Sequence, residues 1–336
     1  MNILYGIQGT GHGHISRARE ILPLLSEKSH VDVLLSGYNC KMTVEGIQIT
    51  KKKGVSLAYD SSGSVSYLKT ALNLKPVEFL QDVNSLELDK YDLVISDYEP
   101  ITAWASFKCK IPSIALSHQA AFLSNKSPRP KKRNFFAEQV LKHFAPCNTP
   151  IGFHFRRYDS FVLPPIIRKD VRDLSVSVSD HVTVYLPAFD HETLTSVFGH
   201  LKEVKWHVFS PLCDTPYLKD NVHVFPVGNR PFLESMKESI GVITSAGFET
   251  CAETMYLDKK LLVIPIQNQY EQECNAAALK QLGIHVVNKL DSTFKDRVRN
   301  WLINADIIPL PELADTDILT DSLVDAAYAK AYDVAY

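Results

Sequence analysis

The chain has 336 residues, a length that favours about two domains. Hydrophobic residues make up 45% and charged residues 22% of it, as in ordinary soluble enzymes. A formal net charge of −2 argues against a general nucleic-acid binder. Without a signal peptide, a membrane-length apolar run or a C-x-x-C pair among six cysteines, we expect a cytoplasmic protein with reduced thiols.

The chain begins with a predicted strand over residues 2–7, a glycine-rich loop over residues 9–14, and a helix over residues 15–28. Glycines in this position let the backbone pass close to a ligand. A dinucleotide-binding G-x-G-x-x-G loop would need glycine where this chain has His14. It would also need an acidic residue at the end of the next strand, which runs over residues 31–35 and ends in Ser36. The sequence therefore argues against a nicotinamide-cofactor site.

Two further buried strands, over residues 93–96 and 112–117, end in polar side chains. Asp97 follows the first strand, and His118 follows the second. Because the carboxyl ends of parallel strands share one edge of a sheet, we expect Asp97 beside the loop that contains His14. An alternative role for Asp97 is the N-cap of the helix that follows it, since aspartate is a good cap.

A basic segment, Lys126–Arg133, breaks the regular pattern with two prolines and carries five basic residues. Such runs are most often solvated surface. The alternative is a contact with an anionic membrane or with a phosphate-bearing acceptor. The amphipathic helix predicted after it, over residues 134–144, contains Phe135, Phe136 and Phe144, which we expect in the core.

Pro164 and Pro165 form a stiff linker between two rounds of alternating strands and helices. This order predicts an α/β protein with two Rossmann-like domains that face each other across a cleft. We place the first domain at residues 1–164, the second at residues 165–312, and a C-terminal helix in residues 313–336. A ligand is expected at the carboxyl ends of both sheets.

Residues 240–283 contain two strand–turn–helix units in series. A helix predicted to start near Phe248 directs its free N–H groups and positive dipole end toward the strand edge, which suits an anion. Ser245 and Thr250 offer hydroxyls to a phosphate, and Gly247 permits close approach. Glu253 lies one helical turn beyond Thr250, where its carboxylate can accept hydrogen bonds from a ribose diol.

The pattern Ser-Ala-Gly-Phe-Glu-Thr-x-x-Glu from Ser245, then Pro265, then Glu-Gln-x-x-Asn-Ala from Glu271, resembles the sugar-donor box of UDP-dependent glycosyltransferases with the two-domain GT-B fold. The opening I-L-Y-G-x-x-G-T-G-x-G-H-x-x-R-A resembles a bacterial and archaeal branch of these enzymes. That branch is related to the lipid II N-acetylglucosaminyltransferase and to the UDP-glucuronosyl- and UDP-glucosyltransferases. This chain departs from the plant-type box at Ser245 and Glu249, where the plant type has His and Asn.

The resemblance implies a role for each matching position. His14 would be the general base on the acceptor hydroxyl, oriented by Asp97, and His12 is a second candidate for that base. His12 and His118 would line the acceptor cleft. The positions implied to bind the sugar donor are Gly11, Gly13, Arg230, Ser245, Ala246, Gly247, Phe248, Thr250, Glu253, Glu271 and Gln272. Within this set, Glu253 would hold the ribose, and Glu271 with Gln272 would hold the sugar.

The function implied is an inverting glycosyltransferase that uses a nucleotide-diphosphate sugar, UDP-linked, with no cofactor and no metal. The first domain would bind the acceptor, which is a glycan, a lipid or a small molecule, and the second domain would bind the sugar donor. The C-terminal helix is expected to pack back on the first domain. Two alternatives remain open at this point: a UDP-sugar 2-epimerase on the same fold, and a non-catalytic nucleotide-sugar-binding subunit.

Overall fold

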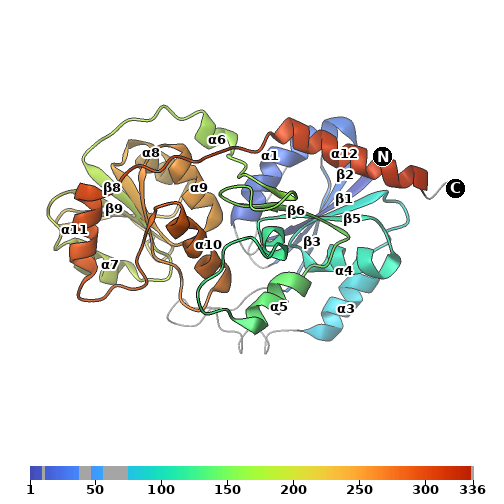
Figure 1. Cartoon of the computed structure of the whole chain (residues 1–336), viewed down its shortest axis with the longest axis horizontal. Coiled ribbons are helices and arrows are strands. Elements are labelled where there is room, and N and C mark those ends of the chain that lie inside the picture. The colour runs from blue at the N-terminus through green and yellow to red at the C-terminus, as the bar shows by residue number, and fades with distance from the viewer. Residues whose placement is uncertain (10–11, 38–46, 56–74, 334–336) are drawn as a thin grey trace.

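The computed structural model describes residues 1–9, 12–37, 47–55 and 75–333, and it has two lobes side by side (Figure 1). In the described residues each lobe is built on a seven-stranded sheet. The strand order is β3-β2-β1-β4-β5-β6-β7 in the first lobe and β10-β11-β9-β8-β12-β13-β14 in the second. Neighbouring strands are parallel except for the β10–β11 pair. The predicted α/β class with two Rossmann-like sheets is confirmed.

The first lobe alternates strands and helices along the chain. Its strands are β1 (Asn2–Gln8), β2 (His30–Ser36), β3 (Ile49–Lys52), β4 (Leu93–Asp97), β5 (Ser113–Ser117), β6 (Thr149–Phe153) and β7 (Val162–Leu163). Its helices are α1 (His12–Lys28), α3 (Pro76–Asn84), α4 (Pro100–Cys109), the short 3-10 helix η1 (Gln119–Leu123) and α5 (Phe135–His143). Strands β1, β4 and β5 are buried almost throughout, as expected for apolar runs covered on both faces.

The second lobe follows the linker and a short helix, α6 (Lys169–Arg172). Its strands are β8 (His181–Tyr185), β9 (Lys205–Ser210), β10 (Tyr217–Lys219), β11 (Val222–Pro226), β12 (Gly241–Thr244), β13 (Lys260–Val263) and β14 (His285–Val286). Its helices are α7 (His191–Phe198), α8 (Asn229–Glu238), α9 (Phe248–Tyr256), α10 (Tyr270–Gln281) and α11 (Phe294–Asn304).

The final helix, α12 (Thr316–Asp333), lies on the first lobe, beside α1 (Figure 1). The chain thus crosses from the second lobe back to the first. Leu319 and Leu323 are buried in the same apolar cluster as Ile21 and Leu25 of α1. This apolar packing holds α12 against α1.

Each sheet has a point where the strand order reverses, and the crevice at such a point is the usual ligand site of doubly wound folds. In the first sheet the reversal lies between β1 and β4, whose register pairs Ile7 with Asp97. In the second sheet it lies between β8 and β12, whose register pairs Tyr185 with Thr244. The loops after β1, β4, β8 and β12 therefore converge on the space between the lobes.

Two predictions about local structure were wrong. Helix α1 begins at His12 rather than near Ile15, so His14 lies within the helix and not in the loop before it. Phe135 and Phe136, expected in the core, are 78% and 62% exposed. Helical periodicity identifies an apolar face, but it does not reveal whether another element covers that face.

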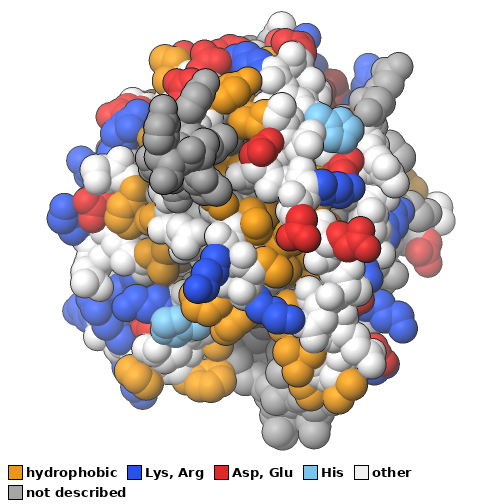
Figure 2. Space-filling model, turned by 90° about the vertical axis from the view of Figure 1, so that its right-hand side faces the viewer, with side chains coloured by type: hydrophobic (Ala, Val, Ile, Leu, Met, Phe, Trp, Pro, Cys, Tyr) orange, Lys and Arg blue, Asp and Glu red, His pale blue; other side chains and the backbone are white. Residues whose placement is uncertain are grey.

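The outer end of the first lobe carries charges of both signs. Figure 2 shows Lys and Arg side chains interspersed with Asp and Glu across this face, with hydrophobic side chains between them. Nucleic-acid-binding proteins instead present a continuous basic stripe. The mixed surface seen from this side fits the near-neutral net charge of the whole chain.

Candidate active site

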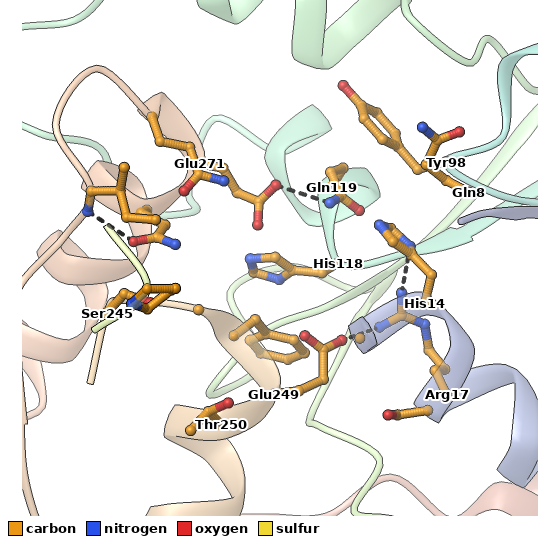
Figure 3. Close-up of a pocket in the computed structure, with 18 of the residues that line it drawn as sticks. Gln8, His14, Arg17, Tyr98, His118, Gln119, Ser245, Glu249, Thr250 and Glu271 are labelled. Carbon is orange, nitrogen blue, oxygen red and sulfur yellow. Dashed lines mark hydrogen bonds and ion pairs between the residues drawn. The ribbon is translucent and has the colours of Figure 1, made fainter. Parts of the chain in front are cut away.

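A cavity of about 370 Å³ lies between the lobes, where the loops from the two reversal points meet. It is lined by residues from both lobes, which Figure 3 shows facing one another: His14 and Arg17 from α1, and Glu249 and Thr250 from α9. The predicted site residues that line it are Gly13, His14, His118, Ser245, Gly247, Phe248, Thr250, Glu253, Glu271 and Gln272.

His14 is paired with Asp97, which is fully buried beneath it. The His14 Nδ1 atom lies 2.7 Å from Asp97 Oδ1. Asp97 does not cap α4, because the N-cap is Glu99, whose carboxylate accepts hydrogen bonds from the N–H groups of Ile101 and Thr102. The capping alternative for Asp97 is therefore wrong, and its carboxylate is available to His14.

The turn that separates these two acidic residues is strained. Tyr98, between Asp97 and Glu99, has a φ of 55°, in the left-handed region that a bulky side chain rarely adopts. This turn directs the Asp97 side chain toward His14 and the Glu99 side chain toward α4. Tyr98 itself lines the cavity.

Arg17, which the sequence analysis did not single out, contacts both members of the His14–Asp97 pair. Arg17 Nη2 donates to Asp97 Oδ1 at 2.7 Å and lies 3.3 Å from His14 Nδ1. An ionised carboxylate oxygen only accepts, so the His14 Nδ1 atom 2.7 Å from Asp97 Oδ1 is the donor in that contact. His14 Nδ1 therefore carries the proton that Asp97 accepts. The lone pair of the neutral imidazole is then on Nε2, as a general base requires.

The start of α9 forms the opposite wall. Gly247 is the N-cap and makes no side-chain capping bond, and an added Cβ there would meet nothing closer than Ser245 Oγ at 4.0 Å. The amides of the first helical turn, at Phe248, Glu249 and Thr250, are thus not satisfied by a side chain at the cap. Uncapped amides at a helix start are a suitable anion site.

Glu253 faces the same cavity but is held by Arg168, another residue that sequence reasoning missed. Arg168 Nε donates to Glu253 Oε1 at 2.6 Å and Nη2 donates to Oε2 at 3.1 Å. Burial raises the pKa of the Glu253 carboxyl above its ordinary value, and the adjacent guanidinium opposes that rise. Arg168 lies directly after the linker and also contacts Asn229, so linker, α8 and α9 meet at this carboxylate.

The predicted sugar-binding pair, Glu271 and Gln272, lies at the start of α10. Glu271 Oε2 accepts a hydrogen bond of 2.9 Å from Gln119 of the first lobe. Gln272 Oε1 accepts one of 2.9 Å from the Ile266 amide, so it holds the loop before α10. Glu271 remains partly exposed and Gln272 is buried.

His118 makes structural contacts between the lobes. Its Nδ1 lies 2.7 Å from the Phe153 carbonyl oxygen, its Nε2 lies 2.8 Å from Asn275 Oδ1, and its ring stacks on Phe248 at 4.0 Å. Asn275 in turn donates to the carbonyl of Ala246. These contacts hold the turn before α9 against the first lobe.

Four predicted residues lie elsewhere or are not fully described. Ala246 is buried and does not line the cavity, and Arg230 is exposed at the start of α8, away from the cavity lining. Gly11 lies outside the described residues, as does the side chain of His12. Among the residues that the structure describes, no group of three or more His, Cys, Asp or Glu is arranged to hold a metal ion.

Comparison with known proteins identifies the family. Residues 1–306 match the model of glycosyl transferase family 1. The chain belongs to this family. No curated protein matches the sequence significantly.

Solved structures agree on the fold. The spinosyn forosaminyltransferase SpnP is 14% identical with a TM-score of 0.62, and the match covers 98% of this chain and 99% of that one. MurG of Acinetobacter baumannii is 13% identical with a TM-score of 0.58, and the match covers 96% of this chain and 99% of that one. UGT89C1 of Arabidopsis thaliana, in complex with UDP-L-rhamnose, is 13% identical with a TM-score of 0.57, and the match covers 99% of this chain and 98% of that one. The predicted GT-B fold is confirmed, and as a member of glycosyl transferase family 1 the chain is a glycosyltransferase.

The interlobe contact at Asn275 gives a stability prediction. Replacing Asn275 with alanine leaves the buried Ala246 carbonyl and the His118 ring without their partner. We expect the unfolding free energy to fall by about 1–3 kcal/mol in urea denaturation. The matched control is Lys280→Ala, an exposed position on the same helix, for which a change within about 0.5 kcal/mol is expected. Equal effects of the two substitutions would contradict this role of Asn275.

Proposed function

We propose that the chain is an inverting glycosyltransferase that moves a sugar from a UDP-sugar to an acceptor hydroxyl, with His14 as the general base. The observation that carries this proposal is the cavity in which the uncapped start of α9 faces the His14–Asp97 pair. The start of α9 can thereby stabilise an anionic leaving group on one side of the site, and His14 can accept a proton on the other side. A single displacement needs these two groups on opposite sides of the reacting carbon.

In the proposed reaction, the acceptor oxygen forms a bond to the anomeric carbon while the bond from that carbon to the diphosphate breaks. His14 Nε2 takes the acceptor proton, and the bonding electron pair leaves with the nucleoside diphosphate. Asp97 accepts a hydrogen bond from His14 Nδ1–H and stabilises the imidazolium that forms. The amides of α9 and the hydroxyls of Ser245 and Thr250 stabilise the charge of the leaving group.

Glu253 and the Glu271–Gln272 pair are proposed to recognise the sugar donor. The Glu253 carboxylate is oriented by Arg168, and each oxygen retains a lone pair for a ribose hydroxyl. Glu271 is partly exposed at the cavity and is positioned by Gln119. On this arrangement the second lobe binds the sugar donor and the first lobe binds the acceptor.

A substitution at His14 tests the proposed base. We expect His14→Ala to lower the rate of UDP release in the presence of a UDP-sugar and a working acceptor by roughly 10²–10⁴-fold. UDP affinity should stay nearly unchanged, because the base contacts the acceptor and not the nucleotide. His143→Ala, an exposed histidine, is the control, and His12→Ala tests the second candidate base. A His14→Ala enzyme with a normal rate would exclude His14 as the base.

We further propose that the segment around Lys126–Arg133 contacts an anionic membrane. Within it, Lys126 is paired with Asp159 and Arg129 with Glu138. Lys131, Lys132 and Arg133 are exposed next to Phe135 and Phe136, the exposed aromatic residues that open α5. Basic side chains beside exposed aromatic rings suit the surface of an anionic bilayer. No helix in the described part of the chain is long and apolar enough to cross a bilayer.

Vesicle sedimentation tests this contact. The wild type should sediment with phosphatidylcholine vesicles that contain a quarter phosphatidylglycerol and stay in solution with pure phosphatidylcholine. Lys131→Glu combined with Lys132→Glu should abolish sedimentation, because each basic residue at the surface contributes about 1 kcal/mol. Lys51→Glu with Lys53→Glu, exposed elsewhere on the first lobe, should leave it intact. An equal loss of sedimentation in the two double variants would show that sedimentation depends on net charge alone, and it would contradict a contact at this segment.

A further inference from the structure

Arg17 is a buried cation whose partners come from both lobes. The residue is 4% exposed and lies one helical turn after His14 on α1. Its Nε and Nη2 donate to the two oxygens of Asp97, at 2.9 and 2.7 Å. Its Nη1 donates to Glu249 Oε1 of α9 at 2.8 Å. The guanidinium therefore joins the His14–Asp97 pair of the first lobe to α9 of the second lobe, the helix at the proposed sugar-donor site.

The close approach of the Glu249 carboxylate to α1 depends on the glycine at position 13. A Cβ on Gly13 would lie 2.3 Å from Glu249 Oε2, too close for any side chain. Glycine at this position lets the Glu249 carboxylate reach α1 and Arg17. The carboxylate is the mobile end of a side chain that is 28% exposed, so a methyl group on Gly13 would displace it.

The charges in this cluster act on His14 in opposite directions. Although burial would raise the pKa of the Asp97 carboxyl, Arg17 and His14 hold that pKa below its ordinary value. Asp97 alone would favour a protonated His14, and the positive charge of Arg17 offsets this effect. Glu249 neutralises part of the Arg17 charge and so restores some of the preference for the protonated ring.

We propose that Arg17 is a positioning residue that couples the placement of α9, through Glu249, to the tendency of His14 to hold a proton. Where α9 is docked and Glu249 contacts Arg17, His14 is the stronger base. Where that contact is lost, the uncompensated charge of Arg17 weakens the base. The inference concerns the role of His14 and so rests on the proposed function.

Other titratable groups near His14 are fixed or do not change in the test. Tyr5 of β1 lies near Asp97 and Arg17, and burial raises its pKa well above the ordinary value, so it stays neutral. The remaining titratable side chains that line the cavity are Tyr98, His118, Arg168, Tyr185, Glu253 and Glu271. They are identical in every variant compared below.

The test is a pH titration of the His14 ring by nitrogen-15 NMR on the whole chain, with the signal assigned through His14→Gln. The wild type should show a neutral ring protonated on Nδ1. Glu249→Gln should move the titration midpoint down by roughly half a pH unit, since a negative charge is lost. Gly13→Ala should move it in the same direction by displacing Glu249 without changing the charge. Arg17→Gln should move it up by roughly one unit.

Opposite shifts in the Glu249 and Arg17 variants support the coupling. A midpoint that is unchanged or raised in both Glu249→Gln and Gly13→Ala would overturn it, and these two variants decide the matter if Arg17→Gln does not fold. A purely structural role of Arg17 would lower the rate without producing shifts of opposite sign. Because the titration uses no substrate, it is independent of the rate measurement on His14→Ala, so failure of the base assignment and failure of the coupling are distinguishable.

Discussion

The buried carboxylate of Asp97 is the group on which the arrangement of the site depends. It has no access to solvent, so its charge is tolerated only because His14 and Arg17 both donate to it. Because the carboxylate only accepts, its contact with His14 Nδ1 fixes the histidine tautomer and leaves Nε2 as the acceptor. The same guanidinium then reaches Glu249, and through it the second lobe.

Contacts between the lobes therefore serve the site as well as the fold. His118 and Asn275 hold the turn before α9, Gln119 holds Glu271, and Arg17 holds Glu249. The first-lobe partners lie on α1 or directly after β5, and the second-lobe partners lie on α9 and α10. Apart from Asn275, the polar side chains that make these contacts also line the cavity.

The sequence predicted what depends on local pattern and strand order. The strands ending at Asp97 and Thr244 and the helix at Phe248 follow from apolar runs and turns, and parallel strands bring Asp97 to the loop after β1. Contacts between distant helices carry no local signal: Arg17 and Glu249 are 232 positions apart. Arg17 was nevertheless detectable in principle, because helical spacing puts it on the face of His14.

The most direct test of this account is a comparison of nucleotide binding by thermal shift, using UDP, dTDP, GDP, CMP and NAD. A ligand that binds only the folded chain raises its melting temperature. The account predicts the largest rise with UDP and a smaller rise with dTDP, which lacks the 2′-hydroxyl. Glu253→Gln should reduce the UDP effect and the difference between UDP and dTDP. A folded chain that responds to none of these nucleotides, or to NAD alone, would contradict the assignment of the α9 wall as the sugar-donor site.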